Sequence, residues 1–185
     1  MNFENIKQEH VLIVAVSLVS IFVLFLLVRL WRRYQSKRKI RNMIKKISYD
    51  FVEDVEIDEG LDQYAHFDFI CLGKQGVHIF SVKNYAGHIF AADEINEWSQ
   101  ILDRKSYKFP NPGFELSHGV ELLKTMTDLE VTGYNIFSDA ADFPKGQPDN
   151  VILCADIFEF FGKMNRRNMS EPVLIDWQKL KQKLA

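Results

Sequence analysis

The chain of 185 residues has room for one compact domain and one short additional segment. Its net charge of −2 hides an asymmetry, since residues 29–46 contain nine bases and no acid, whereas residues 47–185 contain 13 bases and 23 acids. An acidic domain is a poor generic partner for nucleic acid, because phosphate contacts supply most of the non-specific affinity. Cys71 and Cys154 lie in apolar runs without metal-ligand spacing, so we expect buried thiols and no disulfide.

Residues 11–28, VLIVAVSLVSIFVLFLLV, are 18 consecutive uncharged residues. As a helix they would extend roughly 27 Å, close to the thickness of the hydrocarbon layer of a membrane. A cleaved secretory signal would have its positive charge before the apolar run, and here the bases follow it. We therefore expect a single transmembrane helix at residues 11–28.

The bases after this run predict the orientation of the chain. Because Lys and Arg stay on the cytoplasmic side, residues 1–10 should form a short extracytoplasmic N-terminus. Residues 29–49 should continue the helix as a basic juxtamembrane stem near anionic lipid headgroups. The domain of residues 50–185 should be cytoplasmic, and the protein should be a single-pass protein of the plasma (inner) membrane.

The first part of the domain has the pattern of β-structure. Residues 50–60 predict a short strand with an acidic outer face, and residues 61–65 a loop. Two alternating runs, 66–72 and 77–83, are joined at Lys-Gln-Gly and predict a β-hairpin. Residues 87–90 offer a further short strand.

The second part mixes helices and strands. The segment 108–129 opens with two prolines and then has an apolar helical face. Short buried strands are expected at 134–137 and 150–154, with a polar loop between them. Two more helices are expected, the first closed by Gly162 and the second with Ser170 as its cap. This order predicts an α/β domain around one mixed sheet flanked by helices.

Strand alternation suggests where the polar residues of the hairpin lie. It puts His66, Asp68, Ile70 and Leu72 on one face of the first run, and Ile79, Ser81 and Lys83 on one face of the second. Asp68 can then converge with Ser81 and Lys83 across the hairpin. A buried carboxylate opposite a lysine is unusual in a core, because both charges need partners.

The stretch FDFICLGKQGVHIFSVKNYAGHI resembles the central signature of the NERD (nuclease-related domain) family. That signature has an Asp, a Gly turn, and then apolar residues that end in Glu-x-Lys-Asn. EWSQ at 97–100 resembles the family's Trp element, and FPNPGFELSHGVELLK resembles its Asn-Pro, helix and His segment. The resemblance extends over roughly residues 47–180.

The resemblance implies a restriction-endonuclease-like fold of the PD-(D/E)xK superfamily. In such sites an Asp and the Glu of Glu-x-Lys hold Mg²⁺, and the Lys orients or activates the attacking water. Carried over by position, Asp68 matches the Asp and Lys83 the Lys, but Ser81 stands where the Glu should be. A neutral hydroxyl cannot replace an anionic ligand of Mg²⁺ at comparable affinity. Residues 29–49 also lack the Glu that the family tends to carry before its first strand.

Glu115 leaves two interpretations open. It stands where the family usually has a Gln near the site. It is either a migrated carboxylate that restores a metal site with Asp68, or a further change in a site that is no longer required for catalysis. The second interpretation predicts a degenerate nuclease, a pseudo-enzyme without cofactor, that acts as a scaffold for other proteins at the membrane. The alternatives are a membrane-tethered Mg²⁺-dependent DNA or RNA nuclease that uses Asp68, Lys83 and Glu115, and a non-catalytic nucleic-acid-binding module.

The remaining candidates have simpler interpretations. His78 faces away from Asp68 by strand parity and His88 lies past the turn, so with His66 they form no metal set and should be hydrogen-bonded or surface residues. His118 matches a family position, but packing explains it as well as catalysis. The basic cluster GKMNRRNM at 162–169 should be a solvated loop.

Overall fold

The structure is a computed structural model, and it describes residues 3–60, 63–163 and 169–184. Side chains are described at 18–31, 37–57, 64–163 and 169–184. The chain divides into two compact units, Met1–Asn42 and Met43–Ala185. Most of the basic cluster at 162–169 lies outside the described residues.

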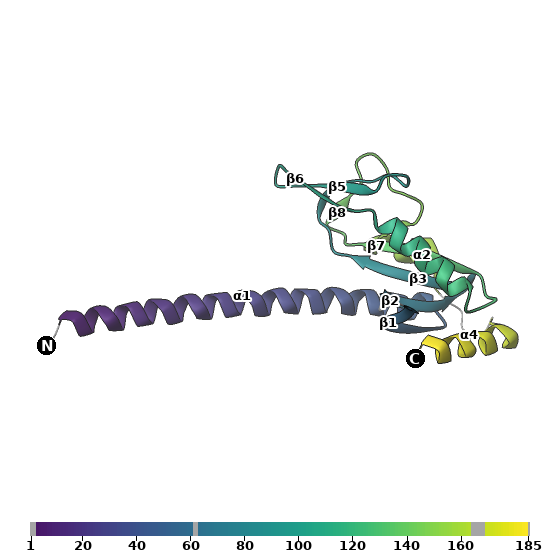
Figure 1. The fold of residues 1–185 in the computed structure, drawn as a ribbon, viewed down its shortest axis with the longest axis horizontal. Helices are drawn as coiled ribbons and strands as arrows, with labels where there is room; N and C mark the ends of the chain where they lie inside the picture. Colours follow the sequence, from purple (N-terminus) through teal and green to yellow (C-terminus); the bar gives the residue numbers. More distant parts are fainter. Residues whose placement is uncertain (1–2, 61–62, 164–168, 185) are drawn as a thin grey trace. The chain divides into compact units, whose positions relative to one another are not determined.

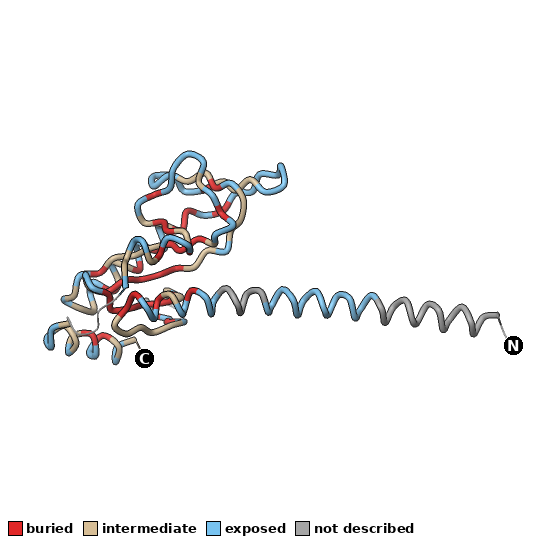
Figure 2. Tube along the Cα trace, turned by 180° about the vertical axis from the view of Figure 1, so that it is seen from behind, coloured by how far each residue is buried: buried red, intermediate tan, exposed pale blue. Residues whose placement is uncertain are grey.

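A single helix, α1 (Phe3–Ile47), accounts for the first unit and continues into the second. The basic stem is therefore helical as expected, as far as Ile47. The side chains of residues 18–31 are exposed, with Leu18 at 62% and Phe22 at 61% (Figure 2). Within the described part of the chain, no helix is long and apolar enough to cross a membrane. The expected span at 11–28 falls in part on residues 11–17, whose side chains are outside the description.

The second unit is built on sheet A, whose strand order is β1-β2-β3-β7-β9 (Figure 1). Its strands are β1 (Asp50–Gly60), β2 (Gln63–Gly73), β3 (Gly76–Lys83), β7 (Val131–Phe137) and β9 (Val151–Leu153). The pairs β1–β2 and β2–β3 are antiparallel, and β3–β7 and β7–β9 are parallel. The expected hairpin is confirmed as β2–β3, with Gly76 at φ 131° in its turn, a conformation that favours glycine. Residues 63–65, which were expected in a loop, belong to β2.

The expected mixed sheet flanked by helices is present as sheet A, but a second sheet, sheet B, was not expected from the sequence. Sheet B has the order β6-β5-β4-β8 and consists of β4 (Gly87–Phe90), β5 (Glu97–Leu102), β6 (Lys105–Pro110) and β8 (Ala141–Asp142). The β5–β6 hairpin turns at Asp103 and Arg104, with φ of 50° and 64°. Such a two-residue turn usually has Asn, Asp or Gly first and Gly second, so Asp103 is typical of it but Arg104 is not. The fold is therefore mixed α/β, with two mixed sheets and flanking helices.

The helices of the second unit cover sheet A. They are α2 (Pro112–Lys124), α3 (Ile157–Phe161), which follows a 3₁₀ turn at Cys154–Asp156, and α4 (Glu171–Leu184). Helix α2 begins at Asn111, whose Oδ1 accepts a hydrogen bond from the Gly113 N–H at 2.8 Å. It lies beside β3 and β7 (Figure 1), and a Cβ at Gly133 of β7 would meet the Leu116 side chain at 2.8 Å.

Two clusters of buried side chains can be described on the α2 side of sheet A and at sheet B. Other buried residues, among them Ile44, Phe69, Phe80 and Ile157, belong to neither cluster. The first lies between sheet A, α2 and α4, and it contains Ile70, Val77, Ile79, Leu116, Leu123, Val131 and Trp177. The second lies at sheet B and contains Ile89, Trp98, Phe109, Phe137, Ala141 and Val151. Strand β7 contributes to both, with Val131 in the first and Phe137 in the second.

The regular alternation of β2 breaks at Asp68. Phe67 packs in the same buried cluster as Ile70 and Leu72, although strict alternation would put it on the other face. In β1, the residue opposite Asp68 is Asp54, which has a φ of 50° and lies between the pairs Glu53–Phe69 and Val55–Phe67. The switch of faces explains a correction: His66, which was expected to share a face with Ile70, is exposed.

Candidate functional site

Asp68 is fixed by the backbone of the neighbouring strand. Its Oδ2 accepts a hydrogen bond from the Val82 N–H at 2.7 Å. The β2–β3 ladder ends at the pair Phe69–Phe80, so this side-chain bond holds the strands together one step beyond the ladder. The carboxylate is half-buried and one of its oxygens is already engaged.

Lys83, the last residue of β3, reaches the first turn of α2. Its Nζ lies 3.1 Å from Oε2 of Glu115, and the two side chains are 19% and 60% exposed. The structure thus brings Lys83 together with Glu115, whereas Asp68, which was expected to converge with Lys83 across the hairpin, is bonded to the Val82 amide. The alternation of side chains along β3 places Lys83 on the face that α2 covers, but it does not predict which carboxylate of the helix lies there. Because Glu115 is more than half exposed, the pair stabilises the fold only modestly.

Ser81 lies between these two contacts and is buried, with 7% exposure. It shares the α2-facing side of β3 with Ile79, a residue of the first core cluster. In the parallel β3–β7 pairing its partner is Asn135, and the next pairs are Ile79–Gly133 and Lys83–Phe137. Position 81 is thus enclosed by the sheet and by the first turn of α2.

Asn135 was not singled out from the sequence, although it belongs to this site. It is 0% exposed, and neither Nδ2 nor Oδ1 has a hydrogen-bond partner among the described residues. Asn150 Oδ1, from the segment before β9, is also buried and unpartnered there. Buried amides nearly always have partners, so this pair calls for an explanation. The available signal was an Asn within the apolar strand YNIF.

Asn111 is a second site residue that sequence reasoning missed. It is 4% exposed, and its Nδ2 donates to the carbonyl oxygens of Asp93 and Ile95 at 3.1 and 2.9 Å, with a longer contact to Ala92 O at 3.4 Å. Since its Oδ1 also caps α2, one side chain fixes both the start of the helix and the loop before β5. The Asn-Pro dipeptide was recognised only as part of a motif.

The residues of this site do not fit a Mg²⁺ ion. Mg²⁺ requires anionic oxygens in an octahedral arrangement. Here Asp68 accepts from a backbone amide, Glu115 is paired with Lys83, and position 81 supplies only a hydroxyl. Over the described residues there is also no group of three His, Cys, Asp or Glu side chains that could hold a metal.

The histidines are dispersed, as parity predicted for His78. His78 is buried on the opposite face of β3, its Nδ1 lies 2.6 Å from Thr132 Oγ1, and burial lowers its pKa to about 4. His88 pairs with Asp142 at 2.7 Å, and both side chains are more than half exposed. These are the hydrogen-bonded and surface roles that were expected. Both cysteines are buried, and burial raises the pKa of the Cys71 thiol.

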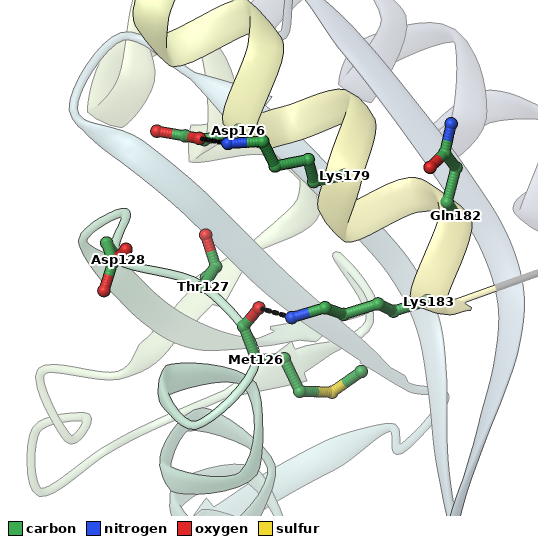
Figure 3. Close-up of a pocket in the computed structure, with 7 residues that line it drawn as sticks. All are labelled: Met126, Thr127, Asp128, Asp176, Lys179, Gln182 and Lys183. Carbon is green, nitrogen blue, oxygen red and sulfur yellow. Dashed lines mark hydrogen bonds and ion pairs between the residues drawn. The ribbon is translucent and has the colours of Figure 1, made fainter.

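A groove of about 370 Å³ lies elsewhere in the domain, between α4 and the loop after α2 (Figure 3). Its lining residues are Met126, Thr127, Asp128, Asp176, Lys179, Gln182 and Lys183. Lys183 Nζ donates to Met126 O at 2.6 Å and Lys179 Nζ to Asp176 Oδ1 at 2.8 Å, so both ammonium groups have partners within the groove. None of the candidate site residues lines it.

A comparison with known protein families agrees with the resemblance of residues 67–89 to the family signature. A model of a family described as nuclease-related domain (NERD) matches residues 32–138, more than half of the chain. The matched stretch includes Asp68, Ser81, Lys83, Glu115 and Asn135, and it ends before β9 and the last two helices. No curated protein matches the chain.

Proposed function

Because the chain belongs to the nuclease-related domain family, we propose that it is a non-catalytic member with a degenerate nuclease site, and that its domain binds another protein. The observation that carries this proposal is the engagement of both carboxylates, Asp68 with the Val82 amide and Glu115 with Lys83. Ser81 adds no negative charge at the position between them. A family fold alone does not establish the family's chemistry, which depends on the residues of the site.

We also propose that residues 11–28 anchor the protein in the plasma membrane, with the N-terminus outside and the domain in the cytoplasm. The support is the uncharged run of 18 residues and the nine bases that follow it without an acid. Apart from Ser20, the described side chains of this run are apolar, and they are exposed, with Phe25 at 59% and Leu27 at 57%. Such a surface is stable only when another apolar phase covers it.

The partner of the domain should present basic and apolar groups. Residues 47–185 hold 23 acids against 13 bases. Beside the cap residue Asn111 lie two exposed apolar side chains, Ile95 at 45% and Phe114 at 51%. Acidic residues at 93, 94, 97 and 115 accompany them in the sequence. A protein surface of opposite charge would complement this region.

The second candidate function is a Mg²⁺-dependent nuclease, and one observation favours it. Glu115 Oε2 lies 3.1 Å from the ammonium of Lys83, so a carboxylate from α2 has reached the lysine of the motif. The carboxylate is nevertheless held in an ion pair, and among the described residues no group of three His, Cys, Asp or Glu side chains could hold a metal.

A cleavage assay separates the two functions. The full chain, purified in detergent and reconstituted in vesicles, is incubated with plasmid DNA or RNA in Mg²⁺ or Mn²⁺, beside Asp68→Asn as the matched control. We expect the wild type and Asp68→Asn to show the same background cleavage. Metal-dependent cleavage that is lost in Asp68→Asn would replace the proposed function by the nuclease.

Flotation with vesicles tests whether residues 11–28 anchor the protein. The dependence of nucleic-acid binding on salt tests the third possibility, a non-catalytic nucleic-acid-binding module. The full chain should float with vesicles and resist extraction at high pH, whereas a chain that is released by alkali would not be an integral membrane protein. Binding to nucleic acid through the basic stem would weaken steeply as salt rises. We expect no such salt-dependent binding by the reconstituted protein.

A further inference from the structure

Helix α4 has an exposed side opposite the side that packs on the domain. Its inner side enters the first cluster through Trp177 and Leu180, which are 0% and 1% exposed. Ile175, on the other side, is 51% exposed. It belongs to a row of exposed residues at helical spacing, which we call the outer stripe of α4: Glu171, Ile175, Gln178 and Gln182.

The surface along the outer stripe is hollowed. A shallow hollow of about 360 Å³ is lined only by residues of α4: Glu171, Leu174, Ile175, Gln178, Lys179 and Gln182. The groove of about 370 Å³ between α4 and the loop after α2 adjoins it, because Lys179 and Gln182 line both (Figure 3). These two residues therefore form a ridge between two hollows, a relief into which the side chains of a second helix can pack.

The charges of α4 are divided along its length. The first half holds the acids Glu171 and Asp176, and the second half holds Lys179, Lys181 and Lys183. Such a helix is complementary to a copy of itself that runs in the opposite direction, whereas a parallel copy would place acid beside acid and base beside base. Lys179 and Lys183 already contact Asp176 and Met126, but an ammonium group has three donors and can bind a further carboxylate.

The rest of the domain would repel a second copy. Residues 47–185 hold 23 acids against 13 bases, whereas α4 holds two acids and three bases. A contact through α4 therefore brings two copies together at a surface where the negative charge of the domain is locally balanced.

We propose that two copies of the chain pair through the outer stripe of α4, with the two helices antiparallel about a two-fold axis. In this register Ile175 lies opposite Gln178 of the other copy. Glu171 lies opposite Gln182 of the other copy, within one turn of Lys179 and Lys183 there. The two-fold axis makes each contact occur twice.

This pairing is weak in dilute solution and stronger on a membrane. One helix from each copy buries less than about 1,000 Å², which is below the size of a stable interface. Chains that are held in one membrane meet at a much higher effective concentration. The proposed anchor thus affects the strength of the pairing, and the pairing is independent of whether the candidate site catalyses a reaction.

Disulfide cross-linking of the full chain in vesicles tests the arrangement. Glu171→Cys and Gln182→Cys are reconstituted separately and as a mixture, and are then oxidised. We expect a cross-linked dimer from the mixture only, because each residue lies about 16 Å along the helix from its own symmetry mate, which is too far for a disulfide. Wild type is the control and should give no product, since Cys71 and Cys154 are both buried.

A second substitution tests whether the outer stripe itself makes the contact. Ile175→Lys, added to both cysteine variants, should lower the yield of the mixture at least ten-fold and leave the Tm unchanged, because Ile175 is exposed. Tyr107→Lys is the matched control on β6, where Tyr107 is 48% exposed, and should leave the yield unchanged.

Three results would overturn the proposal. Cross-linking of either cysteine variant with itself, at the yield of the mixture, would show a parallel or unspecific contact. No product from the folded mixture would show that the outer stripe does not bind a second copy, and would leave it to a different partner. An unchanged yield with Ile175→Lys would place the contact elsewhere on the chain. None of these results bears on the cleavage assay, so they leave the proposed loss of catalysis as it stands.

Discussion

Lys83 and Glu115 join the end of β3 to the first turn of α2, with 3.1 Å between Nζ and Oε2. This contact spans two motifs that are 32 residues apart in the sequence, and it uses the one lysine that the family resemblance marks as functional. In a site that retained its metal, that lysine would be available to the reacting groups. Here it is held by a carboxylate of the same chain.

The energy of this ion pair can be measured by a double-mutant cycle. Lys83→Met, Glu115→Gln and the double variant should give a coupling free energy of about 0.2–1 kcal/mol in urea unfolding, since Glu115 is 60% exposed. The exposed pair Lys124–Glu121 on the same helix is the matched control and should give a smaller value. Coupling above about 2 kcal/mol would mean that the pair is far less solvated than its exposure indicates.

Asn111 should be the most sensitive polar residue near the site. Asn111→Ala removes the cap of α2 and the donors to the 92–95 loop, so we expect a loss of about 2–4 kcal/mol in the free energy of unfolding. Hydrogen exchange of the loop amides should accelerate as well. Asn84→Ala, at an exposed position, should change neither quantity. Equal effects of the two substitutions would show that the loop is held by other contacts.

His78 predicts a loss of stability in mild acid. Burial lowers its pKa to about 4 in the folded protein from 6.5 in the unfolded chain, so the unfolded chain takes up the proton first as pH falls. The stabilisation is present above pH 6.5, decreases below it, and is lost by about pH 4, at a total of about 3 kcal/mol. Urea unfolding at pH 7, 5.5 and 4.5 measures this, and His78→Phe should flatten the slope between them.

Asp50 acts in a different pH window and serves as an internal comparison. Its Oδ2 accepts from Trp177 Nε1 and Lys181 Nζ, and although burial raises the pKa, these hydrogen bonds leave it below 3.8. Its stabilisation is therefore present above that value and is lost only as pH falls further. A pH slope that persists between 7 and 4.5 in His78→Phe would have to come from another group.

Gly119 should not tolerate a side chain. A Cβ on this residue of α2 would overlap the ring of Phe67, which is itself 2% exposed. Although alanine favours a helix by about 1 kcal/mol over glycine, we expect Gly119→Ala to destabilise by about 1–3 kcal/mol. Ser117→Ala, at an exposed position of the same helix, should be neutral or slightly stabilising. Stabilisation by Gly119→Ala would mean that α2 can shift away from β2.

The sequence predicted the β2–β3 hairpin because two signals agreed there, the alternating runs and the glycine of the turn. It missed the β5–β6 hairpin because Arg104 adopts positive φ at the turn position where a Gly usually marks such a hairpin. Sheet B could not be inferred without that hairpin. Of its strands, only β4 was expected.

For the site, parity placed Ser81 and Lys83 correctly on the face that α2 covers, as their neighbours in the first core cluster indicate. It failed at Asp68, because the positive φ of Asp54 switches the faces of both strands and no sequence signal marks that switch. The contribution of Asn135 depends on the β3–β7 register, which joins segments 54 residues apart. Local patterns carry no information about such a pairing.

Ser81 of β3 and Asn135 of β7, which are partners across the sheet, affect how the domain unfolds in part. Two of the buried clusters meet at a hydroxyl and at an amide that has no partner among the described residues, so they are coupled less strongly than one continuous cluster would be. The sheet B half should therefore open as a separate cooperative unit, and the amides of β4 and β5 should exchange at a lower free energy than those of β2 and β3. The candidate site lies where the two clusters meet. A partner that binds there would therefore stabilise the contact between them and suppress this partial unfolding.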